Sequence, residues 1–166
     1  MKRIGLNDVN EFIRHELKRK LRDDLRSHRI LREGDIECCV YFHLRGFLNS
    51  HANWRIFAHK YDKRTGYYPD LVIFRKHAMA FPIEIKWNRK KISNHDRKKL
   101  RKFLKRDASR GYFVTVGPDA DKYKKADKES EEKRNLFEVR TGLNFKDGKK
   151  SALFAKWKKQ RKLFRT

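Results

Sequence analysis

The segment GYYPDLVIFRKHAMAFPIEIKW, residues 66–87, decides the fold. It holds two apolar runs of strand length, DLVIF (70–74) and AFPIEIKW (80–87), joined by RKHAM. Such runs are typical of strands in the interior of a sheet. They nonetheless contain carboxylates at Asp70 and Glu84. Because a carboxylate in a sheet loses hydration and two close carboxylates repel each other, this pattern predicts a site rather than a plain core.

The two carboxylates converge if the runs pair as antiparallel neighbours. Pairing about the centre of the connection brings position 70 opposite residues 83–85, and the period of a strand places Lys86 on the same face as Glu84. Carboxylate oxygens are the hard ligands that Mg²⁺ prefers, and Mg²⁺ keeps water positions open for a substrate phosphate. Two acids and a lysine facing one point form a set suited to phosphodiester hydrolysis, and a structural salt bridge is the alternative. Lys86 would orient the attacking water or stabilise the developing charge.

The neighbouring segments predict an α/β fold with a mixed sheet flanked by helices. In chain order we expect a helix over 7–26, a helix from 35 to about 48, strands over 54–61, 70–74 and 80–87, a helix over 93–109 and a strand over 111–117. The expected helix caps are Asn7 or Asp8, then Asp35, then Ser93 or Asn94. The rest predicts a polar helix or connector, a short strand or extended segment within 136–145, and a basic amphipathic helix over 149–166.

The motif YPD, separated by thirteen residues from EIK, resembles the signature of the PD-(D/E)XK nuclease superfamily, which includes archaeal Holliday junction resolvases and many restriction enzymes. The resemblance covers roughly residues 34–118. It implies a restriction-endonuclease-like αβββαβ core, an order that the residues predict independently. It also implies Asp70 and Glu84 as metal-binding acids, Lys86 as the catalytic lysine and the backbone carbonyl of Ile85 as an extra metal ligand.

The same family often adds a glutamate from the helix before the sheet, and Glu37 fits this role. It borders an apolar stripe on its helix, so it can face the sheet. A plain glutamate on the helix surface is the alternative. Other acid-x-Lys triplets occur, and Asp119 with Glu131 and Lys133 even imitates the whole motif. That second set lies in a polar segment without strand character, so its acids are expected to be solvated and Asp119 to be a helix cap.

The charge of the chain predicts a polyanionic partner. Lys and Arg number 45 against 21 Asp and Glu, a formal charge of +24, and the density is high just after Lys86. The expected nucleic-acid-binding residues are Trp87, Arg89, Lys90, Lys91, His95, Lys98, Lys99 and Lys102. Core packing is the alternative for Trp87, and a solvated basic face is the alternative for His95 and Lys99.

The chain length predicts one domain. We divide it into an N-terminal helical addition (1–33), a nuclease core (34–118) and a basic C-terminal extension (119–166), whose last helix would clamp DNA, form a dimer surface or dock on the core. The adjacent Cys38 and Cys39 predict small buried thiols in a reducing interior.

The sequence has neither an apolar run that could span a membrane nor the apolar core of a secretory signal. We therefore expect no membrane association and an intracellular location, in the cytoplasm or at the nucleoid. The sequence has no Gly-rich phosphate loop and no nucleophile elbow. We expect no small-molecule organic cofactor.

These features together predict a Mg²⁺-dependent endonuclease, with Mn²⁺ as a substitute, that cleaves DNA with structure selectivity or weak sequence specificity. Cleaving a junction would require a two-fold homodimer. The alternative is a non-catalytic nucleic-acid-binding protein on a nuclease-like scaffold, or a ribosomal-type protein that binds through charge alone.

Overall fold

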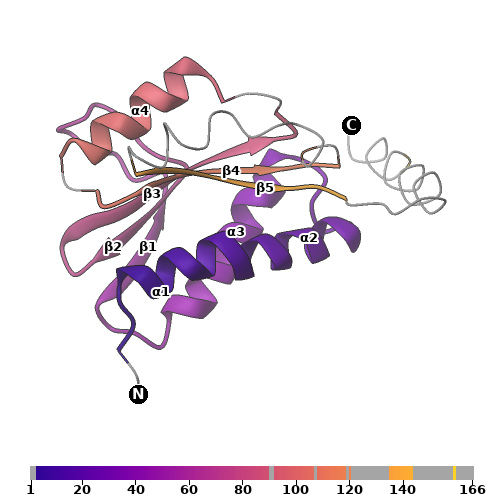
Figure 1. Cartoon of the computed structure of the whole chain (residues 1–166), viewed down its shortest axis with the longest axis horizontal. Coiled ribbons are helices and arrows are strands. Elements are labelled where there is room, and N and C mark those ends of the chain that lie inside the picture. Colours follow the sequence, from indigo (N-terminus) through magenta and orange to yellow (C-terminus); the bar gives the residue numbers. More distant parts are fainter. Residues whose placement is uncertain are drawn as a thin grey trace.

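The computed structural model describes residues 3–89, 92–106, 108–118, 120, 135–143 and 159. These residues form a mixed α/β fold with helices on both faces of a five-stranded sheet, in the order β1-β2-β3-β4-β5 (Figure 1). The elements are α1 (Leu6–Glu11), the π-helical segment η1 (Phe12–Leu17), α2 (Lys18–Arg26), α3 (Glu33–Leu48), β1 (Trp54–Ala58), β2 (Leu71–Arg75), β3 (Ala78–Trp87), α4 (Asn94–Leu104), β4 (Gly111–Val116) and β5 (Leu136–Thr141). The expected α/β class is confirmed.

The sheet changes its pairing mode at β3. The strands β1, β2 and β3 are antiparallel neighbours, whereas β4 runs parallel to β3 and β5 runs parallel to β4. The register Leu71↔Ile83 places position 70 beside position 84. This is the antiparallel pairing expected from the sequence, and it brings the two acidic positions of the motif together.

The β2–β3 hairpin contains a bulge. Its register shifts between Ile73 and Phe74, because Ile73 pairs with Phe81 and Phe74 pairs with Met79, so Ala80 is the extra residue. The carbonyl of Ala80 accepts hydrogen bonds from Ser109 N (3.0 Å) and Arg110 N (3.3 Å), which lie just before β4. The bulged backbone is therefore satisfied by a segment from outside the hairpin.

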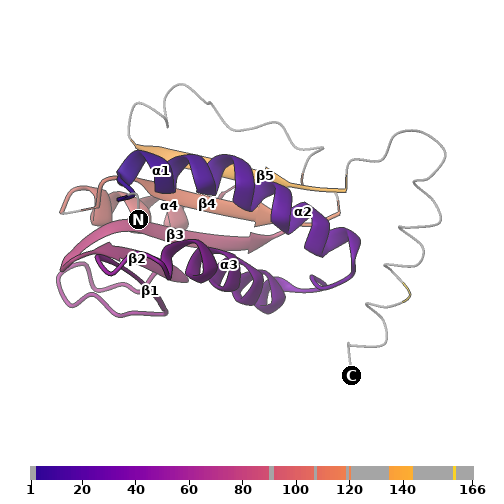
Figure 2. The same cartoon turned by 90° about the horizontal axis from the view of Figure 1, so that it is seen from below.

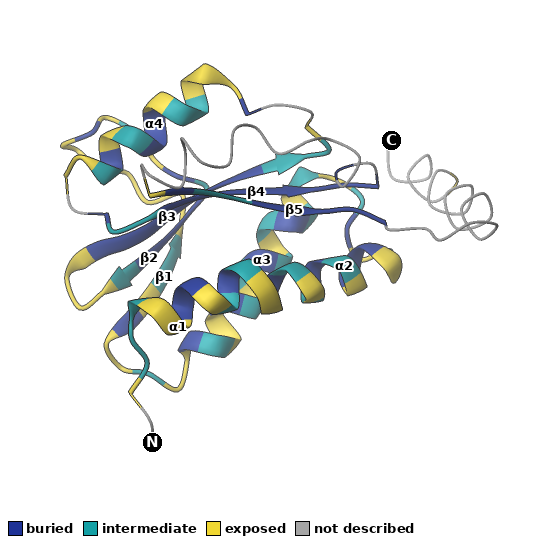
Figure 3. Cartoon of the chain, in the orientation of Figure 1, coloured by how far each residue is buried: buried dark blue, intermediate teal, exposed yellow. Residues whose placement is uncertain are grey.

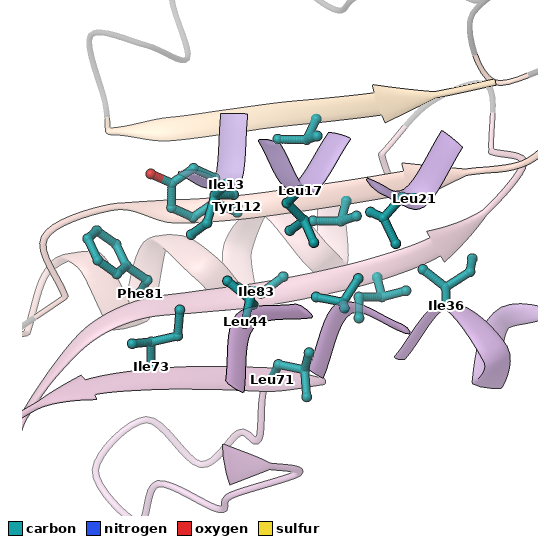
Figure 4. Packing of buried hydrophobic residues seen from close by; sticks show 14 of the residues in the cluster. Ile13, Leu17, Leu21, Ile36, Leu44, Leu71, Ile73, Phe81, Ile83 and Tyr112 are labelled. Atoms are coloured by element: carbon teal, nitrogen blue, oxygen red, sulfur yellow. The ribbon is translucent and has the colours of Figure 1, made fainter. Parts of the chain in front are cut away.

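One face of the sheet packs against the first three helices and the π-helical segment between them. Viewed from below, α1 and α2 lie over β4 and β5, while α3 lies over β1, β2 and β3 (Figure 2). The helices turn a buried stripe toward the strands, visible as alternating colours in Figure 3. Ile13, Leu17, Leu21 and Leu44 meet Ile83 in this layer (Figure 4). The N-terminal helices thus share the main apolar core with the sheet.

The opposite face is covered by α4. Leu100 and Phe103 of this helix pack with Val72, Phe113 and Leu136 in a second apolar cluster. Residues of β3 alternate between the two faces, so odd-numbered Ile83 and Ile85 join the first core. Glu84 and Lys86 consequently lie on the α4 side of the sheet.

The helices α1 and α3 begin earlier than expected, so the predicted cap residues Asp8 and Asp35 lie three residues after the true N-cap. The N-caps of α1 and α3 are Gly5 and Arg32, and the carboxylates of Asp8 and Asp35 reach back to accept from their backbone N–H groups at 2.7 and 3.1 Å. This is the second half of a capping box. Ser93 is the N-cap of α4, as expected, and its hydroxyl accepts from a first-turn N–H.

Two elements end earlier than expected. The strand expected over 54–61 stops at Ala58 because His59 adopts a left-handed φ of 48° that cannot continue a strand. The helix expected over 93–109 stops at Leu104, where the N–H of Arg106 bonds the carbonyl of Phe103 and tightens the last turn.

The cysteine prediction is wrong for Cys38, which is exposed, while Cys39 is half-buried. The apolar stripe of α3 is formed by Ile36, Val40 and Leu44, which places position 38 on the outward side of the helix.

The expected strand within 136–145 is β5, and all six residues of β4 are buried, as a strand covered on both faces requires. The polar segment after residue 120 and the C-terminal helix lie outside the described residues. Within the described part of the chain, no helix is long and apolar enough to cross a membrane.

We expect Leu17→Ala to lower the free energy of unfolding by about 2–5 kcal/mol, because it leaves a cavity between η1 and the sheet. The neighbouring Glu16→Ala change serves as the matched control and should cost less than about 0.5 kcal/mol, because its ion pair with Arg19 is exposed. Urea unfolding of both variants measures the difference. Equal losses of stability in the two variants would show that the packing of η1 against the sheet does not stabilise the protein.

Candidate active site

Asp70, the residue just before β2, is fixed by hydrogen bonds to β3 and to the residue after β1. Its Oδ2 accepts a hydrogen bond of 2.6 Å from the backbone N–H of Ile85 on β3. Its own carbonyl accepts one of 3.0 Å from His59, just after β1. The Asp70 carboxylate therefore reaches β3 and accepts a hydrogen bond from its backbone between Glu84 and Lys86.

Glu84 is the buried member of the site, with only 1 % of its surface exposed. The Lys99 ammonium on α4 lies 2.5 Å from its Oε1, and the Lys86 ammonium lies 3.8 Å from its Oε2. Lys86 is also 3.8 Å from Oδ2 of Asp70. The structure thus brings together the three motif residues, Asp70, Glu84 and Lys86, and adds a second lysine from the covering helix.

Burial and the nearby Asp70 carboxylate raise the pKa of Glu84 from its ordinary value of 4.5 to about 7, although Lys99 and Lys86 oppose this change. The carboxylate is therefore hard to ionise even with two ammonium groups beside it. Two acids that repel each other in this way form a place where further positive charge is favourable.

Burial lowers the pKa of Lys86, but the carboxylates of Asp70, Asp96, Glu84 and Glu33 outweigh it, so that the pKa is raised above its ordinary value of 10.5. Lys86 is therefore an ammonium ion at neutral pH. In this arrangement it can donate hydrogen bonds and neutralise charge, but it cannot accept a proton from water.

Lys99 is buried and held by Glu84, so the solvated-face alternative is wrong for this residue. Its expected role in nucleic-acid binding stays a prediction. The burial of Lys99 could have been recognised from its spacing to Phe103 in the sequence. Lys99 precedes Phe103 by four residues, which puts it on the side of α4 that faces the sheet.

Glu37 lies next to the site without touching its lysine. Its Oε2 is 3.1 Å from Nε2 of His59, whose backbone N–H binds the carbonyl of Asp70. Glu33, one turn earlier on α3, reaches the end of β3 instead, where its Oε2 accepts from the N–H of Trp87 at 2.9 Å. Sequence reasoning missed Glu33, although its spacing of four residues places it on the same helix side as Glu37.

The other residues expected to bind nucleic acid divide into a set of exposed cationic side chains and one aromatic residue, Trp87, at the core. Arg89, His95, Lys98 and Lys102 are exposed, and the Lys102 ammonium lies 4.5 Å from the ring centre of Tyr67. Trp87 is half-buried and packs against the main core on the α3 side of the sheet, which favours its core interpretation over base stacking. Lys90 and Lys91 lie outside the described residues, as do Asp119, Glu131 and Lys133.

The donor set of the site fits a hard divalent cation by its chemistry. Within the described residues, no group of three or more His, Cys, Asp or Glu side chains is arranged to hold a metal ion. Mg²⁺ is nevertheless often bound through only one or two carboxylates, with water as its other ligands. Asp70 and Glu84 supply these two groups, with the Ile85 backbone beside them. In the structure, the ammonium groups of Lys86 and Lys99 balance the charge of these two carboxylates.

Comparisons of this chain with protein-family models, with curated proteins and with solved structures found no match. The functional argument therefore depends on the geometry and chemistry of the site.

We expect the stability of the metal-free protein to fall as the pH rises from 5 to 8, relative to Glu84→Gln. The folded protein holds the Glu84 proton up to a pKa of about 7, whereas the unfolded chain releases it near 4.5. The stabilisation by this proton is complete below pH 4.5 and lost above 7, a change of about 3 kcal/mol. Thermal unfolding in EDTA at several pH values measures it, and parallel profiles for the two proteins would contradict the raised pKa.

We expect Lys99→Met to lower the free energy of unfolding by about 3 kcal/mol at pH 8, because it leaves a buried carboxylate without its nearest partner. The loss should shrink at pH 5, where Glu84 is protonated. Lys98→Met removes an exposed ammonium from the same helix and is the matched control. Equal losses for the two variants would show that the Glu84–Lys99 pair does not form in solution.

Proposed function

We propose that the protein is a divalent-metal-dependent nuclease that hydrolyses phosphodiester bonds in DNA. The observation that carries this proposal is the convergence of Asp70 and Glu84 on the α4 side of the sheet, with the Lys86 ammonium 3.8 Å from an oxygen of each. Two carboxylates and the Lys86 ammonium at one point suit phosphoryl transfer, because negative charge develops on the phosphate and must be stabilised.

The order of the elements supports membership of the PD-(D/E)XK superfamily. From α3 to β4 the chain forms a helix, three antiparallel strands, a helix and a parallel strand. The restriction-endonuclease-like core of that family has the same αβββαβ order. Asp70 stands at the start of the second strand, and Glu84 and Lys86 stand on the third, as the motif requires.

In this proposal each site residue has one role. Asp70 and Glu84 would hold Mg²⁺ or Mn²⁺, which when bound supplies Lewis acidity to the phosphate and to water. The Ile85 N–H orients the Asp70 carboxylate. The Lys86 ammonium would donate to a phosphate oxygen and stabilise the charge that develops there. Glu37 would assist from beside Asp70 through His59.

The surface around the site supports a nucleic-acid substrate. The exposed cations Arg89, Lys98 and Lys102 follow the site strand directly, and the whole chain carries a formal charge of +24. Contacts of this kind grip phosphates without reading bases and weaken steeply with salt.

The second candidate function is nucleic-acid binding without catalysis. The observation that favours it is the 2.5 Å contact between Lys99 and Glu84, which neutralises the buried carboxylate without a metal. Binding of this kind would depend on salt and would be unchanged by EDTA.

The deciding experiment is cleavage of supercoiled plasmid, linear duplex, single strand, four-way junction and RNA with Mg²⁺ or Mn²⁺. We expect the wild type to cut at least one of them. We also expect Glu84→Gln and Lys86→Met each to lower the rate by at least about 100-fold while binding is retained, because the first removes a carboxylate that would hold the metal and the second removes the ammonium that would stabilise the reacting phosphate. EDTA should abolish cleavage.

Glu16→Gln, which changes an exposed carboxylate on the opposite side of the sheet, is the control and should cut like the wild type. Cleavage that survives Glu84→Gln would exclude this site as its source. Tight, salt-dependent binding of every substrate without cleavage would favour the second candidate.

A further inference from the structure

The loop between β1 and β2 exposes two tyrosines, Tyr61 and Tyr68, and of these two described side chains only Tyr68 has a contact with a residue of the candidate site. Tyr61 and Tyr68 each keep 56 % of their surface exposed, which is unusual for a large aromatic side chain. They differ in position. Tyr68 comes two residues before Asp70, whereas Tyr61 lies at the start of the loop.

Tyr68 contacts the cation of the site directly. The Lys99 ammonium lies 5.7 Å from the centre of the Tyr68 ring and 2.5 Å from Oε1 of Glu84. One ammonium group therefore links the exposed ring to the buried carboxylate. A nucleotide that stacks on Tyr68 would lie beside the phosphate position defined by Asp70 and Glu84.

The loop that carries Tyr68 is held in place on both sides. Asp62 and Tyr67 form a β-bridge, closed by a 2.9 Å hydrogen bond from Asp62 N to the Tyr67 carbonyl. The tight turn between them uses Gly66, whose φ of 73° favours glycine. The Tyr67 ring also packs edge-on against His95 of α4, with a centroid distance of 5.9 Å. Little conformational entropy would be lost when a ligand stacks on the neighbouring Tyr68.

The chemistry of an exposed ring on a basic surface indicates its ligand. Every base has a π-face that can stack on an aromatic side chain, and this interaction is the usual platform in proteins that bind single strands. In a duplex both faces of each interior base are already covered by its neighbours. A ring beside the scissile position can therefore stack only on an unpaired or displaced base.

We propose that Tyr68 is a stacking platform for an unpaired nucleotide next to the scissile phosphate. This inference rests on the proposed nuclease function and names its substrate class, nucleic acids with single-stranded character at the cut. The tyrosine is a specificity-determining residue. It favours single strands, flaps and open branch points over a continuous duplex.

The test is binding in EDTA, where no cleavage takes place. Fluorescence anisotropy with a single-stranded oligonucleotide and with its blunt duplex would compare wild type, Tyr68→Ala, Tyr68→Phe and the equally exposed Tyr61→Ala. We expect Tyr68→Ala to weaken single-strand binding by about tenfold and duplex binding by less than about twofold. Tyr68→Phe keeps the ring and should bind both like the wild type, as should Tyr61→Ala.

A spectroscopic readout locates the contact. In a single strand that contains 2-aminopurine, stacking on Tyr68 should quench the fluorescence of the base, and Tyr68→Ala should restore it. Equal losses on single strand and duplex, equal losses for Tyr68→Ala and Tyr61→Ala, or unchanged binding would each overturn the proposal.

The two proposals fail separately. Selective loss of single-strand binding in Tyr68→Ala, in a protein that cuts no substrate, would leave the stacking platform standing and reject the nuclease. Cleavage of duplex and single strand with equal efficiency, unchanged by Tyr68→Ala, would retain the nuclease and reject the platform.

Discussion

The structure depends on one constraint, the neutralisation of a carboxylate inside the central strand of the sheet. Both faces of β3 are covered, by α3 and by α4, so Glu84 has almost no access to water. Its charge is balanced by Lys86 from its own strand and by Lys99 from the helix above. The position of α4 on the sheet is therefore tied to electrostatics as well as to the apolar contacts of Leu100 and Phe103.

The two faces of the sheet have different tasks. The face under α1, α2 and α3 is nearly all apolar, and its buried polar contacts are structural: Tyr112 donates to Asn10 at 2.5 Å, and His43 lies 2.6 Å from Asp24 between α3 and α2. The α4 face mixes apolar and charged side chains. Its charged residues Glu84 and Lys86 lie where β3 has an antiparallel neighbour on one side and a parallel neighbour on the other, and a second charged pair, Glu138 with Arg140, lies on β5. The apolar layer and the charged side chains thus lie on opposite faces of the same sheet.

The sequence was sufficient to predict the parts that depend on local geometry. Strand period and hairpin pairing are short-range properties, so the placement of position 70 opposite residues 83–85 could be predicted, whereas the bulge at Ala80 that selects Glu84 as its neighbour could not. The contact of Lys99 with Glu84 could not be predicted either, because the spacing of Lys99 indicates the side of α4 that faces the sheet but not where along the sheet α4 docks. The same limit explains why the contact of Glu33 with β3 was missed. Small differences in helix placement decide which of two glutamates one turn apart reaches β3.

The bulge at Ala80 determines which side chains of β2 and β3 lie on the same face of the sheet. Residues 74 and 75 pair with 79 and 78, and a regular ladder continued from these pairs would set Asp70 opposite Ile83. Facing residues of antiparallel strands share a side of the sheet, so the Asp70 carboxylate would then point toward α3 and away from Glu84. The inserted residue shifts the ladder by one and reverses this outcome. The loss of one alanine, which belongs to neither the acids nor the lysines, would therefore separate the two carboxylates onto opposite sides of the sheet.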